Sequence, residues 1–268
     1  MTQDPATSPL IRVEGVSMQF GPQRVLDHLN LDVSRGQTLA VIGESGCGKT
    51  VLLKLVIGLM QPTEGRVLFD GQDLSRMGDR ELTRQRLRFG FLFQGAALFD
   101  SLSVFENIAL GLRQLGRATD GQIREIVRQR LQEVGLPATV ETKKPAELSG
   151  GMKKRVGLAR ALALDPEVML YDEPTTGLDP IMSDVINELI AQTRQRHPVT
   201  SIVVTHDMKT VYKVAERVVM LYPFPRLRPG EKQIVFDGSP EELKTSADER
   251  VRQFVEGKAG DLLAEAGR

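Results

Sequence analysis

The stretch GESGCGKT at residues 43–50 decides the fold of this chain. It fits the pattern G-x-x-x-x-G-K-[ST] of a loop that holds nucleotide phosphates. The apolar run 38–42 before it predicts a short buried strand, and residues 49–59 after it predict a helix. A strand, a glycine loop and a helix in this order direct backbone N–H groups and the positive end of the helix at a phosphate. The alternative is a chance glycine turn, which the flanking strand and helix make less attractive.

Each residue type in this loop suits phosphate binding. Gly43, Gly46 and Gly48 allow the backbone to approach the phosphates closely because glycine has no Cβ atom. Lys49 is expected to neutralise the β- and γ-phosphates, and the hydroxyl of Thr50 is expected to hold Mg²⁺. The candidate phosphate-contacting residues are Gly43, Ser45, Gly46, Cys47, Gly48, Lys49, Thr50 and Val51.

Cys47 is the only cysteine of the chain, so an intramolecular disulfide is excluded and a reducing compartment is expected. We interpret it as a small filler of the loop, because nearby phosphate opposes a thiolate. The helix N-terminus acts in the opposite direction, so redox control stays open as an alternative.

Two further motifs follow. The run VMLYDE at residues 168–173 predicts a strand with Asp172 at its carboxyl end, where ligands bind in open α/β sheets. Asp172 is expected in the magnesium shell through water, and Glu173 is expected to orient and polarise the attacking water. The alternative is an acidic pair at a helix N-terminus.

Between the two phosphate-related motifs, LSGGM at residues 148–152 has no role in a single phosphate-loop fold and therefore indicates a second subunit.

The composition excludes several classes of protein. The chain has 268 residues, 41% of them hydrophobic, which is enough for a full core. Lys+Arg and Asp+Glu both number 35, and this neutral balance argues against a nucleic-acid binder. No apolar stretch reaches the roughly 18 residues of a membrane span, and residues 1–9 carry no secretory apolar region. We expect a soluble intracellular protein whose membrane role depends on partners.

The remaining pattern predicts an α/β fold with a helical insert. We expect residues 123–134 to form part of the insert, because their apolar side chains fall on one helix face. The three prolines of 223–231 predict a loop. The predicted strands are 10–20, 25–33, 38–42, 66–70, 89–93, 168–171, 201–204, 218–222 and 233–236, and the predicted helices lie within 49–59, 103–164, 180–195, 241–244 and 249–255.

In this order, the motifs resemble the nucleotide-binding subunit of ATP-binding cassette (ABC) transporters over nearly the whole chain. The resemblance implies a P-loop NTPase (RecA-like) core with an N-terminal antiparallel β subdomain and an inserted α-helical subdomain. It also implies one ATPase domain over 1–268, with a helical signature part at about 95–165 and a C-terminal helical extension at about 240–268. ATP and Mg²⁺ are the implied substrate and cofactor.

The resemblance assigns the LSGGM motif to a head-to-tail dimer. In that family the motif caps the nucleotide held by the other subunit, which here implies roles for Ser149, Gly150 and Gly151. A helix start at Ser149 is consistent with a second anion site, and a serine N-cap is the alternative. Met152 stands where Gln is more usual, which puts the contact made by that Gln in doubt.

Four more positions match the family. Gln94 matches the Q-loop, which senses Mg²⁺ and the transport subunit, and Asp179 matches the D-loop at the dimer seam. His206 matches the switch histidine that contacts the γ-phosphate. Phe20 stands where an aromatic residue stacks on adenine. The alternatives are a solvated Gln94, a helix cap at Asp179 and a strand-end core residue at Phe20.

The segments 93–107, 151–156 and 250–257 are similar to ATPases of Mce-type lipid transporters. This implies an ATPase on the cytoplasmic face of the inner membrane, beneath permease subunits joined to an Mce-domain lipid-binding protein, and allows for a small cytosolic accessory subunit. Phe99 and Phe105 either form a groove for a permease helix or fill the helical insert. The tail 248–268 either reaches the other ATPase subunit or is a frayed surface segment.

Other functions stay open. The same ATPase domain would serve an importer of amino acids or other small solutes. A soluble ABC protein acting on DNA or ribosomes normally carries long coiled-coil insertions or two cassettes, and neither is visible. An inactive cassette is disfavoured by Lys49, Asp172, Glu173 and His206.

Overall fold

The structure is a computed structural model that describes residues 8–116 and 118–258. The chain divides into two compact units, one made of Met1–Met77 and Val204–Arg268 and the other of Gly78–Val203. Residues 1–7 of the polar start and residues 259–268 of the predicted extension lie outside the described residues. Across the described ranges, no helix combines the length and the apolar character needed to cross a membrane.

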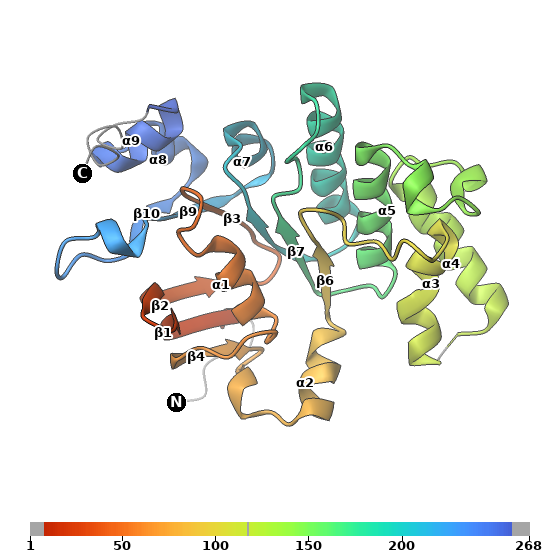
Figure 1. Cartoon of the computed structure of the whole chain (residues 1–268), viewed down its shortest axis with the longest axis horizontal. Helices are drawn as coiled ribbons and strands as arrows, with labels where there is room; N and C mark the ends of the chain where they lie inside the picture. Colours follow the sequence, from red (N-terminus) through yellow and green to blue (C-terminus); the bar gives the residue numbers. More distant parts are fainter. Residues whose placement is uncertain (1–7, 117, 259–268) are drawn as a thin grey trace. The chain divides into compact units, whose positions relative to one another are not determined.

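The first unit begins with the predicted antiparallel sheet, whose strand order is β2-β1-β4-β5. Figure 1 shows β2, β1 and β4 side by side in this order. The strands are β1 (Ile11–Phe20), β2 (Gln23–Val33), β4 (Glu64–Phe69) and β5 (Gln72–Asp73). Gly21, at φ 56°, makes the tight turn that pairs Phe20 with Gln23. This confirms the predicted antiparallel β subdomain, although β5 was not predicted.

The same unit contains the strand that carries the phosphate loop. β3 (Thr38–Ile42) is buried at all five positions and runs parallel to β9 (Arg217–Leu221). β9 pairs antiparallel with β10 (Ile234–Gly238), which confirms the predicted closing strand pair. The chain passes from β3 through the glycine loop into α1 (Lys49–Val56). The helix is shorter than predicted because Gly58 adopts the left-handed φ of 70°.

Three short helices cover this part of the unit. They are α7 (Met208–Val214), α8 (Pro240–Lys244) and α9 (Glu249–Glu256). Val211, Leu243 and Val251, one from each helix, pack in one buried cluster with Ile42 of β3 and Met220 of β9. The C-terminal helices are therefore part of the core that supports the phosphate-loop strand.

The second unit contains the strands β6 (Phe89–Leu92) and β7 (Val168–Asp172) and all of β8 (Thr200–Val204) except its last residue, in the order β8-β7-β6. β6 and β7 are parallel, with Leu92 opposite Tyr171, so both strands end at the same edge. Every residue of these strands is buried, as expected for apolar runs in a parallel sheet. Before β6 lies α2 (Asp79–Arg86), which the sequence did not predict because only Leu82 of this polar helix is buried.

The predicted helical insert consists of α3 (Val104–Leu115), α4 (Asp120–Glu133) and α5 (Gly150–Leu162), which pack on one another. Capping boxes start α3 at Ser103 and α4 at Thr119. Ile123, Val127 and Leu131 are buried, which confirms the predicted apolar face of α4. After β7, Pro180 begins α6 (Pro180–Arg196), as its suitability for the first helical turn predicted.

Candidate functional site

The phosphate loop has a backbone that only glycine adopts without strain at three positions. Gly43, Gly46 and Gly48 have φ angles of 142°, 83° and 103°. A Cβ atom on Gly43 would lie 2.3 Å from the carbonyl oxygen of Leu221, and one on Gly48 would lie 2.5 Å from a methyl carbon of Leu26. The loop is thus packed tightly against its own unit on one side, and a side chain at these positions would push it out of shape.

Lys49 lies at the first position of α1 and is 7% exposed. Its Nζ donates to the carbonyl oxygens of Gly43, at 2.8 Å, and of Glu44, at 2.9 Å. The ammonium group is therefore fixed inside the curve of the loop. The N-terminus of α1, with its positive partial charge, begins at the same residue. Thr50 follows it, half-buried, in the first turn of the helix. These donors fit the phosphates of a nucleotide.

Cys47 fills the buried side of the phosphate loop. It is 1% exposed, and burial raises the pKa of its thiol. A buried thiol of raised pKa is a poor nucleophile at neutral pH, which supports the filler interpretation. The amide of Gln233, itself buried, donates to the carbonyl oxygens of Cys47, at 3.2 Å, and Val25, at 2.9 Å.

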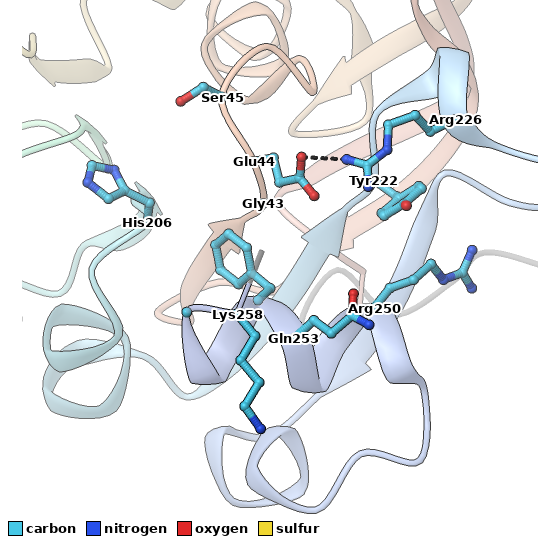
Figure 2. A pocket seen from close by; sticks show the side chains of 11 residues that line it. Gly43, Glu44, Ser45, His206, Tyr222, Arg226, Arg250, Gln253 and Lys258 are labelled. Atoms are coloured by element: carbon cyan, nitrogen blue, oxygen red, sulfur yellow. Dashed lines mark hydrogen bonds and ion pairs between the residues drawn. The ribbon is translucent and has the colours of Figure 1, made fainter. Parts of the chain in front are cut away.

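A pocket of about 420 Å³ opens beside the start of the phosphate loop (Figure 2). Nη1 of Arg226 donates to Oε2 of Glu44 at 2.6 Å. The guanidinium carbons of Arg226 and Arg250 lie 4.9 Å and 5.2 Å from the centre of the Tyr222 ring, in cation–π range. The lining residues are Gly43, Glu44, Ser45, His206, Tyr222, Arg226, Arg250, Gln253, Phe254, Gly257 and Lys258.

His206 lies on the wall of this pocket and is exposed. It follows the buried Thr205, whose N–H donates to the carbonyl oxygen of Val41 at 3.2 Å. It precedes Asp207, the N-cap of α7, whose carboxylate accepts from the N–H of Lys209 at 2.9 Å. Fixed backbone on both sides thus presents the imidazole at the pocket that the phosphate loop lines.

Phe20 lies at the end of β1 and is 43% exposed. The core alternative for this residue is therefore wrong. A half-exposed ring next to a tight turn is available for stacking on a planar ligand.

In the second unit, the two acidic residues occupy different environments. Asp172 ends β7 and is 6% exposed. Glu173 follows in the left-handed region, at φ 47°, which is uncommon for a residue with a side chain. The hydroxyl of Thr176 donates to Oε2 of Glu173 at 3.2 Å. A strained conformation of this kind persists only where the surroundings enforce it, and it is frequent at active sites.

Gln94 lies two residues beyond the end of β6 and is exposed. The parallel register brings the ends of β6 and β7 to one edge, so Gln94, which follows β6, and Asp172, which ends β7, belong to neighbouring strands. Nζ of Lys154, on α5, donates to the carbonyl oxygens of both Gln94 and Glu173. Burial lowers the pKa of Lys154 to about 8, while the charges of Asp172 and Glu173 act in the opposite direction.

Ser149 and Asp179 are both helix caps. The hydroxyl of Ser149 accepts from the N–H of Met152 at 3.3 Å at the start of α5. The carboxylate of Asp179 accepts from the N–H groups of Ile181, at 2.9 Å, and Met182, at 3.0 Å. The helix-cap alternatives are confirmed, and a cap at a helix N-terminus is compatible with an anion site at the same place.

Gly151 is buried behind this helix start, and a Cβ atom there would lie 2.6 Å from a Met182 carbon. Gly150 is exposed at the first position of α5. The LSGG element therefore places the N-terminus of α5 at the surface. Its second glycine, Gly151, is needed for the close packing against Met182.

The two phenylalanines after Gln94 differ in exposure. Phe99 is 51% exposed, and its N–H donates at 2.8 Å to the side-chain oxygen of Asn107, which fixes the loop to α3. Phe105 is half-buried, and the guanidinium of Arg113 lies 5.5 Å from its ring centre. Phe99 therefore does not fill the helical insert and is available to a partner.

Sequence reasoning missed Lys154, Arg226 and Gln233. Arg226 lies in a segment that was predicted only as a proline-rich loop, and Gln233 was predicted only as a strand residue. Each acts on a motif distant in the chain, through backbone or side-chain contacts that no spacing rule reveals.

A phosphate loop between a buried strand and a helix, together with an α/β architecture, defines a P-loop nucleotide-binding protein. A family model described as ABC transporter matches residues 26–176. The chain therefore belongs to the ABC transporter family as an ATP-binding subunit, and it is an ATPase of the P-loop NTPase fold.

Relatives agree with this assignment. The chain is 41% identical over 250 residues to the intermembrane phospholipid transport system ATP-binding protein MlaF of Haemophilus influenzae, covering 93% of this chain and 91% of the relative. It is 40% identical to the probable ribonucleotide transport ATP-binding protein mkl of Mycobacterium leprae, covering 92% and 69%. The dimeric cassette MJ0796, solved in a post-hydrolysis state bound to ADP and Pi, superimposes with a TM-score of 0.76 at 30% identity, covering 86% and 98%.

Proposed function

We propose that this chain is the ATP-hydrolysing subunit of a transporter that moves phospholipid between the inner and outer membranes through an Mce-type permease complex. The observation that carries the proposal is its similarity to MlaF of Haemophilus influenzae, whose name describes intermembrane phospholipid transport and which aligns over nearly the whole of both chains. The exposed Phe99 beside the Gln94 loop supports the docking on a permease, because an aromatic anchor suits a groove that receives a permease helix.

The phosphate loop is proposed to hold ATP. Lys49 binds the β- and γ-phosphates, and Thr50 provides a hydroxyl for Mg²⁺. The packed glycines and the N-terminus of α1 supply the N–H donors. The half-exposed ring of Phe20 stacks on the adenine, and the imidazole of His206 contacts the γ-phosphate.

Hydrolysis is proposed to depend on the two residues at the end of β7. Asp172 belongs to the magnesium shell through a water molecule, and the side chain of Gln94 belongs to the same shell, which suits an ion that prefers oxygen ligands and keeps several of its waters. When bound, Mg²⁺ neutralises charge on the phosphates. Glu173 accepts a proton from the attacking water and orients it, and its enforced backbone conformation supports such a fixed role.

The protein is proposed to work as a head-to-tail homodimer. The start of α5, with Ser149, Gly150 and Gly151, binds the phosphates held by the partner copy, and Asp179 lies at the seam. The dimeric state of the similar cassette MJ0796 supports this. We take residues 1–268 as one ATPase domain, with the signature helices at about 95–165 and an extension at about 240–268.

The dimer is proposed to sit on the cytoplasmic face of the inner membrane, held by permease subunits. An Mce-domain lipid-binding protein completes the complex, and a small cytosolic accessory subunit is a further partner. ATP closes the dimer, and hydrolysis reopens it, so the permeases convert closure into lipid movement.

A second candidate is the ATPase of a small-solute importer. The relative from Mycobacterium leprae, named for ribonucleotide transport, favours this alternative at a similar identity. The two candidates share the ATPase residues and differ in the permease and the cargo.

The test is purification of the tagged chain from detergent-solubilised native membranes, with mass spectrometry of both proteins and lipids. Recovery of a multi-span permease, an Mce-domain protein and bound phospholipid is the expected result. A different permease with a solute-binding protein would overturn the lipid proposal in favour of the importer. Recovery only from the soluble fraction, without a permease, would contradict both.

A further inference from the structure

One face of α5 contacts the loop that contains Gln94. The guanidinium of Arg160 donates to the carbonyl oxygens of Ala96 and Ala97, both at 2.7 Å. These alanines have left-handed φ angles of 60° and 46°, so the loop is held in a strained conformation. A Cβ atom on Gly157 would lie 3.2 Å from the Cβ atom of Ala96, which shows how closely the helix approaches the loop.

Lys154 lies one helical turn before Gly157 on the same face, which is the spacing that makes two helix residues neighbours. It is 4% exposed. Its Nζ donates to the carbonyl oxygen of Gln94 and, at 3.1 Å, to the carbonyl oxygen of Glu173. A single buried ammonium thus joins the backbone of the Gln94 loop to the backbone of the residue that follows β7.

The acceptor at Glu173 is itself constrained. Its φ of 47° is strained, and its carbonyl oxygen also accepts from the N–H of Thr176 at 3.3 Å. Since the allowed side-chain rotamers depend on φ and ψ, the donors to this carbonyl restrict where the Glu173 carboxylate can point. A buried charge without hydrogen-bond partners is costly, and two carbonyl acceptors and two nearby carboxylates make this one tolerable.

We propose that Lys154 is a positioning residue that couples the Gln94 loop to the catalytic glutamate. A displacement of residues 94–97 is transmitted through the ammonium group to the backbone of Glu173 and changes the aim of its carboxylate. The start of α5 is the LSGG element, so the same lysine connects that element to the water-activating residue. The proposal rests on the proposed function, because it takes Glu173 as the residue that activates water.

The test compares ATP hydrolysis by the full-length chain and by its Lys154→Met variant, which keeps a side chain of similar length and removes the charge and the donors. We expect kcat to fall roughly tenfold to a hundredfold, since a misplacement of about 1 Å has this effect. The KM for ATP should change by less than about twofold, because no substrate contact is removed. Lys153→Met is the matched control and should keep the wild-type kcat, since it removes the same charge from the neighbouring position.

A purely structural role would lower kcat and nucleotide affinity together through loss of folded protein. Affinity for a fluorescent ATP analogue is therefore measured on each variant. Lys154→Gln, whose amide can still donate, should have a kcat between those of Lys154→Met and the wild type, and it serves as the reporter if Lys154→Met does not fold. A wild-type kcat in either variant would overturn the coupling.

Glu173→Gln is measured in parallel. If Glu173→Gln is inactive while Lys154→Met turns over normally, the coupling through Lys154 fails and the proposed function stands. If Glu173→Gln is active, the proposed function of Glu173 fails first.

Discussion

Arg226 donates a 2.6 Å hydrogen bond to Glu44, the second residue of the phosphate loop. The arginine belongs to a short turn after β9, and its guanidinium also lies over the ring of Tyr222. Both charged side chains are partly exposed, at 21% and 28%. The loop that is proposed to bind ATP is therefore braced by a residue 182 positions later in the chain.

This ion pair predicts a measurable effect on nucleotide binding. Arg226→Ala should raise the KM for ATP about threefold to fivefold, the range for a partly exposed ion pair, with little change in kcat. Arg228→Ala, in the same loop between β9 and β10, removes the same charge without contacting Glu44 and should leave KM unchanged. Reversal of the pair in a Glu44→Arg, Arg226→Glu double variant should recover part of the loss. Equal KM values for Arg226→Ala and the wild type would show that the ion pair between Arg226 and Glu44 has no effect on ATP binding.

Lys49→Ala should abolish tight nucleotide binding. The variant loses charge-assisted hydrogen bonds to phosphate, so affinity should fall about tenfold to a hundredfold. Titration with a fluorescent ATP analogue measures the effect, and Lys54→Ala, near the end of the same helix, is the control. Unchanged affinity in Lys49→Ala would contradict the assignment of the phosphate site.

Phe20→Ala should weaken ATP binding about tenfold, the typical effect of losing one base–aromatic stack, whereas Phe20→Tyr should bind as well as the wild type. Because the ring is 43% exposed, its removal should leave the melting temperature nearly unchanged. Phe99→Ala, which removes another exposed ring, should leave ATP affinity intact. The prediction fails if Phe20→Ala and Phe99→Ala bind ATP equally well.

Two glycines of the phosphate loop should differ in their effect on stability. Gly46→Ala meets no atom within 4 Å and incurs only the cost of its positive φ, about 1 kcal/mol. Gly43→Ala adds a collision with the carbonyl oxygen of Leu221 and should cost about 2 kcal/mol or more. Denaturant unfolding without nucleotide compares the two variants, and equal stabilities would show that the loop is not packed as described.

Much of the fold could be predicted because local patterns agree with the final packing. The five buried residues of β3 and the regular apolar spacing of α4 each identify their element without any knowledge of the neighbours. The helix α2 could not be predicted, since it buries little apolar surface and carries charged residues on most of its faces.

The functional motifs were also accessible from sequence, whereas the residues that support them were not. Lys154 acts on main-chain oxygens, and Arg226 acts on a loop in a distant part of the chain. Neither contact depends on a short spacing, so only the folded backbone reveals it. The exposure of Phe20 and Phe99 likewise follows from tertiary packing, and it rules out the core interpretation of Phe20 and the filler interpretation of Phe99.

Glu173→Gln tests the proposed water-activating role of this glutamate, and it is measured for ATP hydrolysis and for molecular mass in solution with and without ATP. We expect retained ATP binding, a fall in turnover of about a hundredfold or more, and an ATP-dependent mass of two chains, because water is no longer activated and the closed dimer accumulates. Glu125→Gln, an exposed acid on α4, is the control and should behave as the wild type. Hydrolysis by Glu173→Gln at a near wild-type rate, with no ATP-dependent dimer, would show that Glu173 does not activate the attacking water.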